Sequence, residues 1–146
     1  MAGTVHQWLL LWVARKMSAD GFLLGGFEAP VPQGGIWNAL PLPFDFGGFR
    51  PDGWGVHLDT SLFAFAEAKS WSDIDTQHTR AQLKTFGFVT MRESRERCPL
   101  YIGVPRSGGG WLDRVLKDVD LLGAAHVNRI EVPDVLLQER LDECRR

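Results

Sequence analysis

Cysteine is scarce in this chain of 146 residues. The two cysteines, Cys98 and Cys144, lie far apart and lack the spacing of metal ligands, which excludes a zinc motif and a disulfide framework. Long apolar runs are missing too, because the stretch from Trp8 to Ala14 is too short to span a bilayer. No charged segment precedes this stretch as in a signal peptide. We therefore expect a cytoplasmic protein with reduced thiols and no membrane contact.

An excess of charge of either sign is also missing. The formal net charge is −2, so the overall composition does not indicate a nucleic-acid-binding protein, although a basic strip can be local. Aromatic residues are abundant, with six Trp and nine Phe, which indicates an aromatic interior or a dimer interface. The length fits one domain over residues 1–146, and such a domain buries about 70% of the surface of its unfolded chain.

Apolar periodicity and turn signals predict the order of helices and strands. We expect a helix at 5–19, a strand within 21–31, a long loop at 30–43, a hairpin over 50–69 and a helix at 76–87. A strand at 99–105, a helix at 111–122, a strand at 127–132 and a C-terminal helix from about Asp134 follow. This order predicts an α/β fold, a three-layer sandwich with a central mixed β-sheet flanked by helices. A right-handed β-α-β connection makes the strands after the hairpin parallel.

The predicted hairpin brings two acidic residues together. Side chains alternate between the faces of a strand, and a two-residue loop at Asp59 and Thr60 sets the register of the two strands. Stepping back from this loop pairs Asp52 with Glu67 and places Lys69 one pleat further along the same face. Two carboxylates and an ammonium group are therefore expected at the end of an otherwise apolar face.

This placement indicates a metal site. Carboxylates that face each other across a strand pair repel, so a purely structural sheet is not expected to contain them. Mg²⁺ takes oxygen ligands, and Asp52, Glu67 and the backbone carbonyl of Ala68 can supply them. Lys69 can then hold or deprotonate a water that attacks phosphorus, or offset the charge that builds on a phosphate.

Pro51-Asp52 followed by Glu67-Ala68-Lys69, on a hairpin that leads into a helix, resembles the motif of the PD-(D/E)XK nuclease superfamily. This superfamily includes restriction endonucleases, Holliday-junction resolvases and recombination-repair exonucleases. The resemblance implies a restriction-endonuclease-like fold over most of the chain. It also implies that Asp52 and Glu67 bind the metal and that Lys69 is the catalytic lysine.

A second, weaker element lies on the predicted helix that follows. Gln82-Leu-Lys-Thr-Phe86 resembles the Gln-x-x-x-Tyr element of some of these nucleases, with Phe86 in the place of the Tyr. The resemblance implies that Gln82 is an auxiliary catalytic residue that orients substrate or water.

Further residues are candidates for the same site. The superfamily sometimes adds an acidic residue from its first helix or strand, which makes Glu28 a candidate, with a solvated strand carboxylate as the alternative. His78 lies one turn before Gln82, so it is either a general base or a residue at the rim that touches phosphate or water. The candidates for contact with a nucleic-acid backbone are Arg50, Arg80 and Lys84.

Together these features predict a metal-dependent nuclease that hydrolyses DNA phosphodiester bonds as an endonuclease, with Mg²⁺ as cofactor and Mn²⁺ as a substitute. A homodimer is expected, because two sites related by a twofold axis are the simplest way to cut two strands. The alternative is a non-catalytic DNA-binding or assembly module that retains the nuclease fold. Asp52, Glu67 and Lys69 are all present, which favours the enzyme. RNA as the substrate, and the shape of the substrate, stay open.

Overall fold

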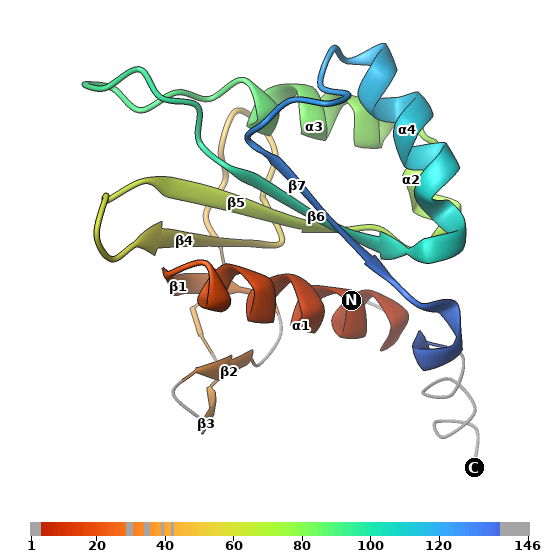
Figure 1. Cartoon of the computed structure of the whole chain (residues 1–146), viewed down its shortest axis with the longest axis horizontal. Helices are drawn as coiled ribbons and strands as arrows, with labels where there is room; N and C mark the ends of the chain where they lie inside the picture. The colour runs from red at the N-terminus through yellow and green to blue at the C-terminus, as the bar shows by residue number, and fades with distance from the viewer. Residues whose placement is uncertain (1–3, 29–30, 34–35, 39, 42, 138–146) are drawn as a thin grey trace.

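The computed structural model describes residues 4–28, 31–33, 36–38, 40–41 and 43–137 (Figure 1). The first part of the chain forms α1 (Thr4–Ala19), β1 (Phe22–Phe27), β2 (Val31–Gln33), β3 (Ile36–Asn38), β4 (Gly53–His57) and β5 (Phe63–Ala68). The second part forms α2 (Trp71–Ile74), α3 (Gln77–Gly87), β6 (Leu100–Pro105), the short 3-10 helix η1 (Arg106–Gly108), α4 (Gly109–Asp118) and β7 (Val127–Val132). The protein therefore has the α/β architecture that the order of elements predicted.

One mixed sheet of five strands organises the fold, in the order β1-β4-β5-β6-β7. β4 pairs antiparallel with both β1 and β5, whereas β6 pairs parallel with both β5 and β7. The helices α2, α3 and α4 supply the connections between the parallel strands. The predictions of a mixed sheet and of parallel strands after the hairpin are confirmed.

Helices cover both faces of this sheet. α1 lies along one face, and α2, α3 and α4 lie on the other (Figure 1). The alternation of side chains along β5 explains the two cores, since Ala64 and Ala66 pack towards α1 while Phe65 stacks on Phe86 of α3 with ring centroids 5.0 Å apart. This layering is compatible with the predicted three-layer sandwich.

The close approach of α1 to the sheet depends on Gly103 in β6. A Cβ atom at Gly103 would lie 2.6 Å from Cγ2 of Val13 and 3.2 Å from the carbonyl oxygen of Leu9. The first distance is shorter than real Cβ contacts and the second is tight, so a larger residue at 103 would require Val13 or α1 to shift. α1 therefore packs close to the sheet. Its first turn lies at the end of the sheet where β5 ends (Figure 1).

The hairpin has the predicted register but a longer loop. Val56 pairs with Phe63 and Trp54 with Phe65, as expected. The loop has four residues, 58–61, because the N–H of His57 donates to the carbonyl of Leu62 (2.8 Å) and the N–H of Ser61 donates to the carbonyl of His57 (3.0 Å). Ser61 has a φ of 63°, which a two-residue Asp59-Thr60 loop would not have required. A four-residue loop with the same centre leaves the register unchanged.

Two other predictions are corrected. The predicted loop at 30–43 contains the antiparallel pair β2 and β3, and strands of three residues are too short for their alternation to be recognised. α4 covers 109–118 rather than 111–122, because Asp120 has a φ of 61°, a left-handed conformation that a helix cannot continue through. The predicted C-terminal helix is present at 134–137, and its remainder lies outside the described residues, as does Cys144.

None of the described helices is long and apolar enough to cross a membrane. The longest, α1, has 16 residues, whereas a membrane-spanning helix needs about 20.

Candidate metal centre

Asp52 lies at the centre of the candidate site. It immediately precedes β4, and its backbone N–H donates to the carbonyl of Ala66 in β5 (3.1 Å). Its carboxylate accepts a hydrogen bond from the N–H of Ala68, with 2.8 Å between that nitrogen and Oδ2. The side chain is thus held, nearly buried, against the end of β5. The structure shows Ala68 engaged through its N–H, and a ligand role of its carbonyl stays a prediction.

Glu67 lies beside Asp52 and is fully buried. Within the described part of the chain, neither of its carboxylate oxygens has a hydrogen-bond partner. Burial, followed by the negative charge of Asp52, raises the pKa of Glu67 well above its usual range. A buried carboxyl group without a hydrogen bond is costly, and the sheet tolerates it here next to a second carboxylate.

Lys69 is the residue after Ala68, and its side chain extends toward the carboxylate of Glu67. Its Nζ lies 3.7 Å from Oε2 of Glu67 and donates a hydrogen bond to Oε1 of Gln82 on α3. Both Lys69 and Gln82 are largely shielded from solvent. The structure therefore brings together four predicted site residues, Asp52, Glu67, Lys69 and Gln82.

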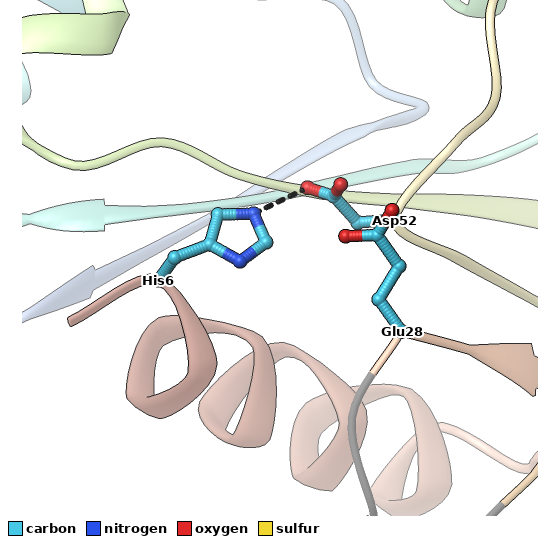
Figure 2. A group of neighbouring side chains, drawn as sticks. All are labelled: His6, Glu28 and Asp52. Carbon is cyan, nitrogen blue, oxygen red and sulfur yellow. Dashed lines mark hydrogen bonds and ion pairs between the residues drawn. The ribbon is translucent and has the colours of Figure 1, made fainter. Parts of the chain in front are cut away.

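A histidine that the sequence analysis missed completes the site on its other side. Nε2 of His6, in the first turn of α1, lies 3.0 Å from Oδ2 of Asp52. Figure 2 shows His6, Glu28 and Asp52 pointing toward one another from α1, from the residue after β1 and from the residue before β4. One nitrogen or oxygen atom of each lies within 4.8 Å of the others, a spacing that fits three ligands of one cation.

The electrostatics of this group couple His6 to Asp52. Burial lowers the pKa of His6, but the hydrogen bond to Asp52 and its negative charge outweigh burial, and the pKa is raised. Burial likewise acts to raise the pKa of Asp52, but the hydrogen bond and charge of His6, together with the N–H of Ala68, hold it below its usual value. Asp52 is therefore the ionised carboxylate of the pair that it forms with Glu67.

The sequence contains little that would identify His6 as a site residue. It lies one residue after Val5 and two before Trp8, in a helix whose other sequence features indicate only packing on the sheet. Its partner Asp52 is 46 residues away, and no local spacing links them. Glu28, which was a candidate, does join the group.

The other predicted residues lie outside this group. His78 is exposed, and its ring packs against Phe49 with centroids 5.6 Å apart. Arg80 is held by Asp75 (2.8 Å) and Asp118 (2.9 Å), so its guanidinium group joins α3 to the end of α4. Lys84 is exposed on α3. His78 therefore fits a surface position better than that of a general base, and Arg80 is occupied within the protein.

No family model matches the chain, and no curated protein or solved structure matches it. The function is therefore inferred from the geometry of the site itself.

Proposed function

We propose that the protein is a metal-dependent nuclease of the PD-(D/E)XK type that hydrolyses DNA phosphodiester bonds as an endonuclease. The observation that carries the proposal is the buried carboxyl group of Glu67, without a hydrogen-bond partner among the described residues, beside the ionised Asp52 and 3.7 Å from Lys69. A fold stabilised only by packing gains nothing from this arrangement. A site that binds a cation requires carboxylates held close together in this way.

The donors at the site fit a divalent cation. Asp52 and Glu28 offer carboxylate oxygens, which suit Mg²⁺ and Mn²⁺, and His6 offers an imidazole nitrogen, which suits transition metals better than Mg²⁺. Glu67 lies beside Asp52, outside this group of three, as a further carboxylate. Binding a cation would also offset the negative charge of Asp52, which together with the larger effect of burial raises the pKa of Glu67. The reduced repulsion between the two carboxyl groups supports a metal at this position, with Mg²⁺ or Mn²⁺ as the candidates.

Each residue then has a distinct task. A divalent cation bound by these carboxylates supplies a Lewis acid for the phosphate and lowers the pKa of a bound water. Lys69, held in place by Gln82, directs its ammonium group to the carboxylate end of the site, where it can orient the attacking water or offset charge on the phosphate. Asp52 and Glu67 hold the cation, and the hydrogen bonds of Asp52 to His6 and Ala68 fix its carboxylate.

The architecture also supports this proposal. The two catalytic carboxylates come from the antiparallel hairpin β4-β5, the parallel strands follow, and α3 carries the auxiliary Gln82, which is the order expected for a restriction-endonuclease-like fold. DNA as the substrate, a homodimer and a cytoplasmic location belong to the same proposal. Lys84, exposed on α3, is a candidate for contact with the DNA backbone.

The proposal is tested with a panel of DNA substrates: plasmid, linear duplex, single strand and four-way junction, each with Mg²⁺, Mn²⁺ or EDTA. We expect cleavage that needs the metal and is lost in Lys69→Ala. Lys117→Ala is the matched control, because Lys117 is an exposed lysine on α4. Asp52→Asn should abolish cleavage and leave DNA binding intact, since it removes a ligand of the metal without changing the surface.

Two results would contradict the nuclease assignment. One is full cleavage by Asp52→Asn. The other is the absence of cleavage of every substrate together with measurable DNA binding, which would favour the non-catalytic module.

A further inference from the structure

Glu28 is held by a cation of the protein itself. Nη2 of Arg50 lies 2.8 Å from Oε1 of Glu28. The Arg50 side chain is 45% exposed, whereas that of Glu28 is 19% exposed. The arginine is therefore the more exposed partner of the pair.

The same carboxylate belongs to the group that faces the candidate metal. Glu28 lies with His6 and Asp52 in the cluster of possible ligands (Figure 2). Arg50 and a divalent cation are thus two positive groups that bind one carboxylate. Since like charges repel, a cation at the cluster weakens the hold of Glu28 on Arg50, and Arg50 in turn opposes the binding of the cation.

Backbone hydrogen bonds hold Glu28 and also Asp52, two residues after Arg50, so an exchange involves the side chains. The N–H of Glu28 donates to the carbonyl of Asp52 (3.0 Å), and the N–H of Asp52 donates to the carbonyl of Ala66 in the sheet (3.1 Å). Pro51, between Arg50 and Asp52, is buried. Arg50 is consequently anchored next to the site at its Cα while its guanidinium group stays at the surface.

The energy of the contact permits an exchange. An ion pair with one partner half exposed contributes at most about 1 kcal/mol. A phosphate group offers the same guanidinium two parallel charge-assisted hydrogen bonds. A negatively charged substrate that arrives together with the metal can therefore take Arg50 from Glu28.

We propose that Arg50 is an exchangeable partner of Glu28. It neutralises this carboxylate in the metal-free protein and binds a substrate phosphate once a divalent cation occupies the site. This inference rests on the proposed function. It assigns Arg50 two states that alternate with the metal.

Two measurements test the exchange. The first is titration of Mn²⁺ into the wild type, Arg50→Gln and the control Arg15→Gln, which removes the same charge from an exposed residue of α1. The second is DNA affinity with Mn²⁺ and with EDTA over a range of salt concentrations, in a Lys69→Ala background that keeps the DNA intact.

Arg50→Gln should bind Mn²⁺ about three- to tenfold more tightly than the wild type, because a competing charge is gone, while Arg15→Gln should not change it. With Mn²⁺, Arg50→Gln should bind DNA about fivefold more weakly and lower the slope of log affinity against log salt by about one. With EDTA the DNA affinity should be unchanged. Tighter Mn²⁺ binding together with weaker DNA binding in the presence of Mn²⁺ would establish the exchange.

Weaker Mn²⁺ binding by Arg50→Gln would overturn the inference, because Arg50 would then be a support of Glu28. An equal loss of DNA affinity with and without Mn²⁺ would also overturn it, because Arg50 would be a permanent phosphate contact. A wild type that binds Mn²⁺ and cuts DNA keeps the proposed function in both cases. A wild type that binds no metal refutes both proposals.

Discussion

Lys69 donates a hydrogen bond to Oε1 of Gln82, a contact between the residue after β5 and the middle of α3. The amide oxygen carries no charge, so it restrains the ammonium group without neutralising it. Among the described residues, Glu67 is the acidic residue with which Lys69 forms an ion pair, at 3.7 Å. In the proposed nuclease, Gln82 is therefore a positioning residue, which holds Lys69 beside Glu67 and would act on the reaction through it.

We predict that Gln82→Ala lowers kcat for DNA cleavage by about 10–100-fold, because a displacement of a catalytic group by about 1 Å has an effect of this size. KM and metal affinity should change little, since the hydrogen bond that the structure shows for Gln82 is to Lys69. Steady-state kinetics over a range of DNA concentrations separates the two parameters.

Gln77→Ala is the matched control, because Gln77 is an exposed glutamine in the first turn of the same helix. It should leave kcat unchanged. Wild-type kcat in Gln82→Ala would mean that Lys69 finds its position without Gln82.

A second prediction concerns the buried carboxyl group of Glu67 and its raised pKa. The raised pKa of Glu67 means that its stabilising contribution is present below the ordinary glutamate pKa of about 4.3 and is lost as the pH rises through its pKa in the folded protein. Metal-free Glu67→Gln should therefore be more stable than the wild type at neutral pH, by roughly 1–2 kcal/mol. The same variant should cut no DNA.

Chemical unfolding with EDTA at a series of pH values from acid to neutral checks this prediction. The gain of Glu67→Gln should grow as the pH rises, and saturating Mn²⁺ should stabilise only the wild type. Glu96→Gln, in the exposed loop after α3, controls for the general effect of removing a carboxylate. A Glu67→Gln protein less stable than the wild type at neutral pH would show that the ionised carboxylate supports the fold.

The sequence allowed Asp52 to be placed beside Glu67 because this depends only on alternation and register along one hairpin, whose observed pairs end at Gly53 with Ala66. A four-residue loop in place of the predicted two-residue loop left this pairing unchanged, since both loops have the same centre. The order of the later strands and helices could be predicted for a similar reason, because each element has its own periodicity.

The contacts of His6, Arg50 and Arg80 could not be predicted in this way. His6 meets Asp52 because α1 packs close to Gly103, a distance set by side chains from two distant segments. Arg80 was a candidate for contact with a nucleic-acid backbone, but it pairs within the protein, and one of its partners, Asp118, is 38 residues away. Contacts between distant segments depend on the packing of whole elements, which no local pattern contains.

A third prediction distinguishes the role of His6 from that of His78. His6→Gln should weaken Mn²⁺ binding by at least about tenfold and reduce the preference for Mn²⁺ over Mg²⁺, because an imidazole nitrogen favours transition metals. His78→Gln should change neither property, since His78 is exposed and packs on Phe49. Metal titrations with both ions measure the preference directly, without reference to cleavage. Equal effects of the two substitutions would remove His6 from the metal site.

The last prediction concerns Tyr101, the only tyrosine of the chain, which lies in β6. Its hydroxyl donates to Oδ2 of Asp20 (2.7 Å), and Asp20 is also paired with Lys16 (2.8 Å). Burial, and then the hydrogen bond and charge of Asp20, raise the pKa of Tyr101 far above its ordinary value of about 10.

Above about pH 10 the unfolded chain releases the tyrosine proton while the folded protein keeps it, so the wild type loses stability as the pH rises through this range. Tyr101→Phe should cost about 1.5 kcal/mol at neutral pH, the value of a hydrogen bond to a charged group, and this cost should shrink above pH 10. Urea unfolding of both proteins at each pH gives the difference, in which the titration of lysines cancels. Tyrosinate absorbance identifies the group, because no other tyrosine contributes. A difference in stability that stays constant from neutral to alkaline pH would show that the hydroxyl of Tyr101 titrates equally in the folded and unfolded protein.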